Sequence, residues 1–107
     1  MKMDEYYSCF GFDFEWNTAK AAANIEKHGV SFKEAASTWI DELAVSAGDI
    51  NHSWEEERTL RIGFSKKANL LLVVHCYRDF GNRVRIVSAR RATKEEERIY
   101  ETIRGMA

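Results

Sequence analysis

Proline is absent from the 107 residues of this chain, and cysteine occurs only twice. A chain without proline has no Pro-rich spacer between domains. Two widely separated cysteines argue for neither a disulfide framework nor a metal knuckle. No apolar run approaches the roughly 20 residues that cross a bilayer, and the N-terminal residues carry acids instead of the apolar core of a secretion signal. We therefore expect one cytoplasmic domain without a cofactor or a membrane contact.

A large excess of charge of one sign is also lacking, because 16 lysines and arginines face 17 acids and leave a net charge of −1. The charges are nevertheless segregated. Between Arg58 and Arg91 the only acid is Asp79, whereas residues 41–57 and 95–101 are acidic. An electropositive surface acts within a Debye length of about 8 to 10 Å, so this distribution matters more than the sum. One face of the domain is predicted to be basic.

The first part of the chain is predicted to form a strand and a helix. Residues 10–16, FGFDFEW, alternate aromatic side chains with small or acidic ones, which is the period of a strand with one buried face. Asn17 is a suitable N-cap for a helix over residues 18–28, and Gly29 suits the left-handed position that ends a helix. The stripe expected to face the core is Ala21, Ala22 and Ile25.

A second helix is predicted over residues 32–40, preceded by Ser31, which forms an S-x-x-E capping box with Glu34. The remaining pattern predicts strands over 43–47, 57–64, 69–77 and 83–89, a polar loop over 48–56, and a helix over 94–104 that begins with a Thr93–Glu96 capping box. The order β-α-α-β-β-β-β-α predicts an α+β fold in which helices pack on a mainly antiparallel sheet.

The turn at residues 79–82 sets the register of the last hairpin. Centred on its middle two residues, it places Arg78 opposite Arg83, with Arg85 close to both. The same register predicts the pairs Cys76–Arg85, Val74–Val87 and Leu72–Ala89. Like charges that face each other are unfavourable, so we expect either acidic partners from the chain, such as Glu57, or phosphates from outside it.

Four segments, taken together, resemble the BrnT family of bacterial type II toxins. They read FEWNTAKAAANIEKHGVSFKEA, EEERTLRIGFS, LLLVVHCYRD and RVRIVSARRATKEEERIYE, and the resemblance covers roughly residues 12–101. Residues 1–11 lie outside it and are expected to be a mobile extension or an added strand that does not touch the active face. Residues 12–107 are then the toxin domain.

The resemblance implies a RelE-like fold and a small ribonuclease that arrests translation. It also implies a BrnA-type antitoxin that neutralises the toxin. By the same family analogy, operator DNA is bound only through the toxin–antitoxin complex, and two heterodimers can join as a heterotetramer.

RNA cleavage without a metal needs a base for the 2′-hydroxyl, cations for the phosphorane and an acid for the leaving oxygen. On the family pattern, Arg58, Arg85 and Arg90 are the candidates for phosphate and transition-state contacts, with Glu57 or His28 as the base. The further candidates for RNA contacts are Lys20, Lys27, Arg78, Arg83, Arg91 and Tyr100. The three histidines lack ligand spacing, so no metal is expected.

Each candidate also has a structural alternative. His28 can stabilise the end of its helix, and Glu57 can simply orient an arginine. Tyr100 lies on an apolar stripe, where core packing is expected. His75, among valines and leucines, is expected to be a hydrogen-bonded core residue. In the polar loop, His52 and Trp54 are candidates for a partner contact.

Two other functions are compatible with the same sequence. One is a non-catalytic binding module that acts with its antitoxin as a transcriptional repressor. The other is a domain that occupies the ribosome without cutting RNA. Expression without growth arrest would favour the first, and the absence of new RNA 5′ ends after induction would favour the second.

Overall fold

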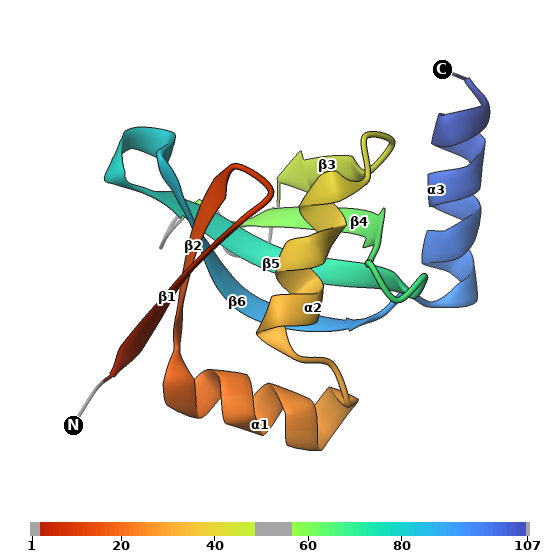
Figure 1. Ribbon diagram of the computed structural model, residues 1–107. Coiled ribbons are helices and arrows are strands. Elements are labelled where there is room, and N and C mark those ends of the chain that lie inside the picture. The colour runs from red at the N-terminus through yellow and green to blue at the C-terminus, as the bar shows by residue number, and fades with distance from the viewer. Residues whose placement is uncertain (1–2, 49–56, 107) are drawn as a thin grey trace.

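A computed structural model describes residues 3–48 and 57–106 (Figure 1). Its strands are β1 (Asp4–Cys9), β2 (Phe12–Asn17), β3 (Val45–Gly48), β4 (Thr59–Phe64), β5 (Leu70–Arg78) and β6 (Arg83–Arg91). Its helices are α1 (Thr18–His28), α2 (Phe32–Ala36) and α3 (Lys94–Gly105), with 3₁₀ turns η1 (Ser37–Ile40) and η2 (Asp79–Gly81). One sheet holds the strands in the order β1-β2-β6-β5-β4-β3. Only β2 and β6 are parallel neighbours, so the sheet is mixed within an α+β domain.

The predicted order is wrong at its start, because the chain begins with two strands instead of one. β1 forms an edge of the sheet and pairs antiparallel with β2. The hairpin turn between them holds Phe10 and Gly11, both at positive φ. Of the predicted aromatic face, Phe14 and Trp16 are buried. The N-terminal segment is therefore an added strand, which was one of the two expectations for it.

Helix ends lie where the capping residues predicted them. Asn17 and Thr93 accept the expected backbone hydrogen bonds at α1 and α3, and Gly29 follows α1 in the left-handed conformation. The box predicted for the second helix is only half formed. Ser31 caps α2, but the Glu34 carboxylate accepts hydrogen bonds from the β4–β5 turn instead of returning to the cap.

Only part of the stripe predicted for helix α1 faces the core. Ala21 packs against the main core cluster, but Ala22 is exposed and Ile25 half exposed, and the buried residue of α1 is Asn24. The Asn24 amide donates to the carbonyls of Val30 (2.9 Å) and Ala89 (2.8 Å) and accepts from the Ala89 N–H (3.1 Å). A fully hydrogen-bonded amide can be buried at little cost, so a polar residue holds α1 to β6 where an apolar stripe was expected.

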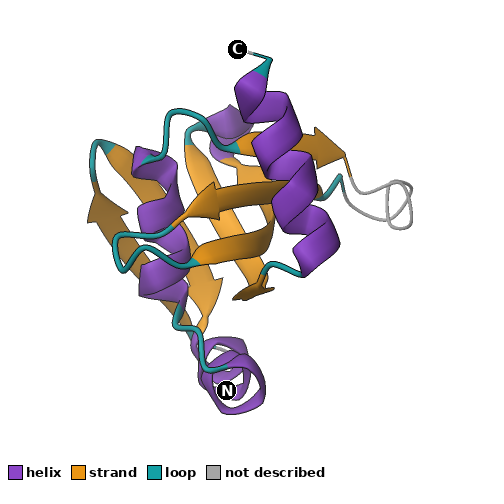
Figure 2. Cartoon of the chain, turned by 90° about the vertical axis from the view of Figure 1, so that its right-hand side faces the viewer, coloured by secondary structure: helices purple, strands orange, loops and turns teal. Residues whose placement is uncertain are grey.

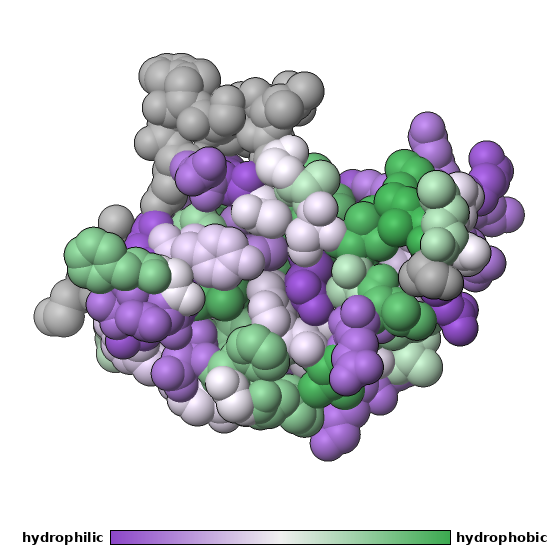
Figure 3. All heavy atoms as spheres, turned by 90° about the horizontal axis from the view of Figure 1, so that it is seen from above, coloured by the Kyte–Doolittle hydropathy of each residue, from purple (hydrophilic) through white to green (hydrophobic). Residues whose placement is uncertain are grey.

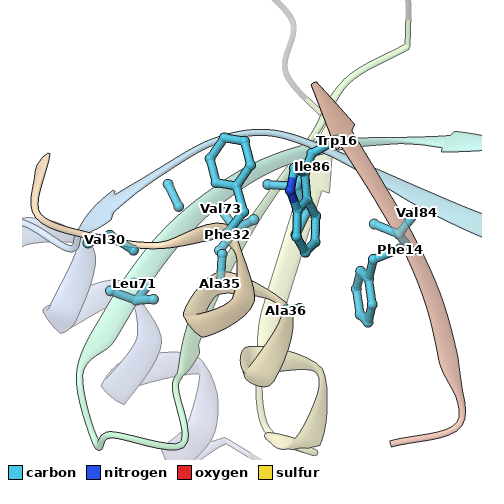
Figure 4. Close-up of a cluster of buried hydrophobic side chains, with 11 residues drawn as sticks. Phe14, Trp16, Val30, Phe32, Ala35, Ala36, Leu71, Val73, Val84 and Ile86 are labelled. Atoms are coloured by element: carbon cyan, nitrogen blue, oxygen red, sulfur yellow. The ribbon is translucent and has the colours of Figure 1, made fainter. Parts of the chain in front are cut away.

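Helices α2 and α3 cover opposite faces of the sheet (Figures 1 and 2). Leu71 and Val73 of β5 belong to the main core cluster with the α2 residues, and Figure 4 shows this cluster. Leu72, which lies between them, packs instead with Ile62 and with Tyr100 of α3. Successive side chains of a strand point to opposite faces. The sheet is thus a central layer with a core on each side.

The register of the β5–β6 hairpin is as predicted near its turn, where the pairs are Arg78–Arg83, Tyr77–Val84, Cys76–Arg85 and His75–Ile86. An irregularity between Val74 and His75 then shifts the pairing by one residue, so Leu72 faces Arg90 instead of Ala89. The predicted pairs beyond this bulge are wrong. A bulge inserts one residue into a ladder, and the alternation of the sequence does not reveal it.

Large apolar side chains are exposed on α3 and directly after it, namely Ile99, Ile103 and Met106. Figure 3, seen from above, shows hydrophobic residues gathered on the α3 side of the molecule next to strongly hydrophilic ones. Within the described residues, no helix has the length and apolar character needed to span a membrane. The predicted contacts of His52 and Trp54 lie outside the described residues, as does most of the predicted polar loop.

Candidate functional site

One cavity joins three of the residues that the sequence proposed for chemistry. It has a volume of about 470 Å³ and lies where β3 and β5 end and β4 begins. Its described lining consists of Gly48, Glu57, Arg58, Thr59, Tyr77 and Arg78. We call it the strand-end pocket. Pairing of Gly48 with Thr59 on β4 brings the strand ends together. Side chains far apart in the sequence thereby share one surface.

The strand-end pocket combines the group types that RNA cleavage requires. Glu57 supplies a carboxylate, Arg58 and Arg78 supply guanidinium groups, and Tyr77 supplies a phenol. Among the described residues, no carboxylate forms an ion pair with Arg58. Arg78 donates a hydrogen bond to the sulfur of Cys76 at 3.3 Å. Within the described residues, Arg58 thus has no carboxylate partner, and it lines the same cavity as a carboxylate and a phenol.

A row of buried rings supports Tyr77 from behind. The His75 ring meets the Tyr77 ring edge-on, with centroids 5.3 Å apart, and meets Trp39 at 4.9 Å. Arg61 in turn lies over Trp39, 4.3 Å from the ring centroid. Tyr77 itself is 53% exposed, and its ring packs on the buried His75 ring. The phenol is therefore placed by packing from the sheet.

His75 is a core histidine, as expected. Its side chain is fully buried, but the expected hydrogen bond is missing, because neither ring nitrogen has a partner in the part of the chain that the structure describes. Burial, with a smaller contribution from the positive charge of Arg61, lowers the pKa of His75 to about 4. Burial likewise lowers the pKa of Arg61. The His75 ring is thus uncharged at neutral pH, which suits its contacts with two aromatic rings.

The arginines at the start of β6 gather at one end of the sheet, as the register predicted, but they are not free. Arg85 forms two hydrogen bonds of 3.2 Å with Asp4 and a further contact with Glu15. Arg83 also reaches Glu15, at 3.4 Å, and lies over the ring of Tyr6. The hydrogen bonds that Arg85 donates to Asp4 are the main cause that raises the pKa of Arg85.

These contacts correct two expectations. The carboxylates that neutralise Arg85 come from β1 and β2, whereas Glu57, the suggested partner, lines the strand-end pocket. The N-terminal extension was expected not to touch the candidate face, yet Asp4 is bound directly to Arg85. Arg83 and Arg85 therefore do not form an uncompensated cationic cluster.

Arg90 is neutralised in the same manner at the start of α3. Its guanidinium donates two hydrogen bonds to the Glu96 carboxylate, at 2.8 and 2.9 Å. This bond is the main cause that lowers the pKa of Glu96. Glu96 also accepts from the backbone of Thr93, so one carboxylate both caps α3 and holds Arg90. Arg91, the next residue, is exposed.

The candidates on α1 gather in a separate groove. Lys20, Lys27 and His28 line a hollow of about 230 Å³ together with Val87 and Ser88 of β6. His28 is half-buried there, at the end of α1. Since none of these residues lines the strand-end pocket, His28 is not placed to act as the base for a phosphate bound beside Glu57.

Tyr100 has the alternative role, that of a core residue. It is 2% exposed, packs with Ile62 and Leu72, and donates its hydroxyl to Asp41 at 2.9 Å. A buried ring whose hydroxyl is already bonded cannot stack on RNA, so the expected RNA contact is wrong. Its ring and hydroxyl instead anchor α3 to the sheet and to the segment after η1.

The sequence did not reveal two sets of residues, one in the strand-end pocket and one around Arg85. Tyr77 and Thr59 line the strand-end pocket, and Glu15 with Asp4 neutralises Arg85. Alternation did place Glu15 on the polar side of its strand. Its partner became visible only through the parallel pairing of β2 with β6, which sets Glu15 opposite Arg85.

Among the described residues, no group of three or more His, Cys, Asp or Glu side chains is arranged to hold a metal ion. A family model described as the ribonuclease toxin, BrnT, of type II toxin–antitoxin systems matches residues 16–96, which is most of the chain. The match includes the described lining of the strand-end pocket but neither β1 nor the start of β2. No curated protein matches the chain.

Proposed function

Because the chain belongs to the BrnT family of ribonuclease toxins of type II toxin–antitoxin systems, we propose that it is a cytoplasmic endoribonuclease that works without a metal and inhibits translation. The family implies an RNA target and an antitoxin partner. In this proposal the antitoxin is of the BrnA type, the fold is RelE-like, and operator DNA is bound only by the toxin–antitoxin complex, as a heterotetramer.

The observation that carries the proposal is the strand-end pocket. It is a cavity in which Glu57, Arg58 and Tyr77 lie together, and Arg58 is without a carboxylate partner among the described residues. A planar guanidinium binds phosphate oxygens in pairs. We therefore assign the scissile phosphate to Arg58, with Arg78 beside it.

The reaction is a transesterification in which the RNA supplies its own nucleophile. Glu57 accepts the proton of the 2′-hydroxyl while the 2′-oxygen forms a bond to phosphorus. Arg58 stabilises the extra negative charge of the phosphorane. The bond from phosphorus to the 5′-oxygen breaks, and in this proposal Tyr77 donates the proton that this oxygen takes up. The products are a 2′,3′-cyclic phosphate and a 5′-hydroxyl end.

The remaining sequence candidates take other roles in this proposal. Lys20, Lys27 and His28, with the exposed Arg91, bind phosphates of the RNA away from the bond that is cut. Arg83, Arg85 and Arg90 are held by carboxylates of the chain. They contribute to the reaction only if RNA displaces those carboxylates, which makes them second choices after Arg58.

The test compares Glu57→Gln, Arg58→Ala and Tyr77→Phe with the unchanged protein on single-stranded RNA in EDTA. We expect each substitution to slow cleavage by about 10²-fold or more. Glu95→Gln and Arg98→Ala on α3 remove the same charges from exposed positions and serve as matched controls with unchanged rates. Folded Arg58→Ala protein that cleaves at the full rate would contradict the site.

A second function is favoured by one observation, the neutralisation of Arg85 and Arg90 by the chain itself. A toxin fold that no longer cuts RNA needs only its binding surface, and it would act with its antitoxin as a transcriptional repressor. Induction with and without the antitoxin separates the two. Growth arrest that the antitoxin relieves, with new RNA 5′ ends, supports the ribonuclease; repression without arrest supports the binding module.

A further inference from the structure

A second cavity lies on the side of the sheet covered by α2, away from the strand-end pocket. Its volume is about 340 Å³, and its lining residues belong to the β1–β2 hairpin, to α2 with the residues next to it, and to the β4–β5 turn. The residues that matter for its chemistry are Tyr7, Phe10, Lys33, Glu34, Lys66 and Lys67. We call this cavity the lysine cleft. It shares no described residue with the strand-end pocket, and its size suits a small ligand.

The three ammonium groups of the lysine cleft have no carboxylate partner within residues 3–48 and 57–106. They belong to Lys33, Lys66 and Lys67, which are exposed. The arginines of β6 differ in this respect. Three cations around one cavity attract an anion, because their repulsion is relieved only by negative charge from outside.

The acid in the lining is already used to hold the turn in place. Glu34 is 9% exposed, and its carboxylate accepts hydrogen bonds from Ser65 (2.7 Å) and Asn69 (2.9 Å). The Lys66 N–H donates to the Ser37 hydroxyl at 2.9 Å. The backbone that carries the lysines is thus fixed against α2, so little order has to be gained when an anion binds.

Aromatic rings form the opposite wall. The Lys33 ammonium lies 5.3 Å from the centroid of the Tyr7 ring. Phe10 is 47% exposed, and the hairpin turn holds it at φ 54°. A left-handed backbone is unfavourable for phenylalanine, and the exposed ring gains little from packing. An exposed ring beside several cations is the arrangement on which nucleobases stack in proteins that bind single-stranded RNA.

We propose that the lysine cleft binds a nucleotide unit, with the phosphate on Lys66 and Lys67 and the base against Phe10 and Tyr7. This goes beyond the proposed function, because the cleft lies outside the strand-end pocket and its binding does not depend on cleavage. Tyr7 and Phe10 precede the residues matched by the family model. The added hairpin therefore gives this chain a binding site that residues 16–96 alone would not form.

The probe is a fluorescently labelled, single-stranded RNA of about twelve nucleotides, with 2′-O-methyl groups that prevent cleavage. Its dissociation constant is measured by anisotropy for the full chain. We expect Lys66→Ala combined with Lys67→Ala to weaken binding about fivefold or more. Lys94→Ala combined with Arg98→Ala removes two exposed cations from α3 and should change binding less than about twofold.

The aromatic contact has a closely matched control. Phe80 is fully exposed at the tip of the other hairpin and has the same φ of 54° as Phe10. Asparagine tolerates this conformation, so neither Phe10→Asn nor Phe80→Asn should disturb the fold. Loss of one base stack predicts about fivefold weaker binding for Phe10→Asn and no change for Phe80→Asn.

Equal weakening by the target and control substitutions would overturn the proposal, since binding would then reflect overall charge. Tighter binding of a poly-glutamate peptide, lost in the same variants, would also overturn it and assign the cleft to an acidic protein segment. Competition by uridine monophosphate identifies a free nucleotide as a ligand, whereas binding of the probe alone identifies an RNA strand. Both of these support nucleotide recognition, and neither depends on cleavage by the strand-end pocket.

Discussion

The arginines of β6 and the lysines of the lysine cleft are two basic regions with opposite electrostatic environments. Arg83, Arg85 and Arg90 are each paired with a carboxylate of the chain. Lys66 and Lys67 have no such partner among the described residues. The stretch RVRIVSARRAT holds four arginines, but three of them form ion pairs with carboxylates of the chain. Whether a basic region can bind phosphate depends more on how many of its cations are already paired with carboxylates than on how many cations it has.

The difference follows from where each region lies. β6 has β2 on one side and leads into α3, so carboxylates of Glu15 and Glu96 are held within reach of its guanidinium groups. Lys66 and Lys67 occupy a turn, and Glu34, the acid that lines the same cleft, is hydrogen-bonded to that turn's own side chains. Arginine in a sheet readily serves structure, whereas lysine on an exposed turn keeps its charge for a ligand.

The largest loss of folding stability is expected for a substitution of Glu15. Its side chain is 8% exposed, and it contacts both Arg83 and Arg85. Glu15→Gln leaves a partly buried arginine with Asp4 alone, and we expect a loss of about 2 to 3 kcal/mol in the free energy of unfolding. Urea denaturation measures it, with the exposed Asp13→Asn as the matched control. An unchanged midpoint for Glu15→Gln would show that the β6 pairs contribute nothing to the fold.

The next largest loss of stability is expected for a substitution of Glu96. Its contribution can also be measured through the pH dependence of the free energy of unfolding. The hydrogen bond from Arg90 lowers the pKa of Glu96, so the unfolded state binds protons first as the pH falls. This contribution is therefore full above the ordinary pKa of glutamate and is lost as the pH falls through the lowered one. Glu96→Gln should cost about 1 to 2 kcal/mol at neutral pH and flatten the acid dependence of stability.

Glu97→Gln, in the same exposed turn of α3, is the control for Glu96→Gln and should keep the acid dependence of the unchanged protein. The measurement is the free energy of unfolding between about pH 7 and pH 3. Parallel curves for Glu96→Gln and the unchanged protein would contradict the role of the Arg90 pair. A flattened curve would show that Arg90, like Arg85, is part of the fold's own charge balance.

A smaller effect is expected at Asp4, whose side chain is 34% exposed. Asp4→Asn should cost less than about 1 kcal/mol because solvent screens this pair. It should leave RNA cleavage unchanged, since Glu15 still holds Arg85. The rate of cleavage in EDTA is the measurement that matters. A clear increase would show that Asp4 blocks Arg85, and the contrast between paired arginines and free lysines would then no longer hold.

The smallest change in stability is expected for substitutions of Lys66 and Lys67. Lys66→Ala combined with Lys67→Ala should change the free energy of unfolding by less than about 0.5 kcal/mol, because no carboxylate of the described chain loses a partner. The same urea denaturation applies, alongside the RNA-binding measurement. A loss as large as that of Glu15→Gln would mean that the turn lysines also serve the fold.

The parts of the fold predicted correctly have local causes. Asn17, Gly29 and Thr93 mark helix ends because a cap involves only a few neighbouring residues. The pairing of Arg78 with Arg83 follows from the turn between them. Within the candidate site, Glu57, Arg58 and Arg78 were named from the sequence, by family pattern and by register. Their common cavity was not predicted.

The parts that were missed depend on contacts distant in the sequence. Asn24 is buried because the backbone of Ala89, far along the chain, satisfies its amide. The bulge beside His75 moves Arg90 to the side of the sheet where Glu96 lies. The spacing of apolar residues predicts neither the hydrogen-bond partner of a buried amide nor the position of a β-bulge.

By itself, the sequence determined the helix ends, most of the strands and the crowding of arginines at one end of a hairpin. Each of these follows from backbone preferences and side-chain alternation over a few residues. Only the tertiary structure decided which cations are free. A charge is neutralised by what lies within a few ångströms of it, and that neighbourhood was set when β2 came to lie parallel to β6 and the N-terminal strand was added beside it.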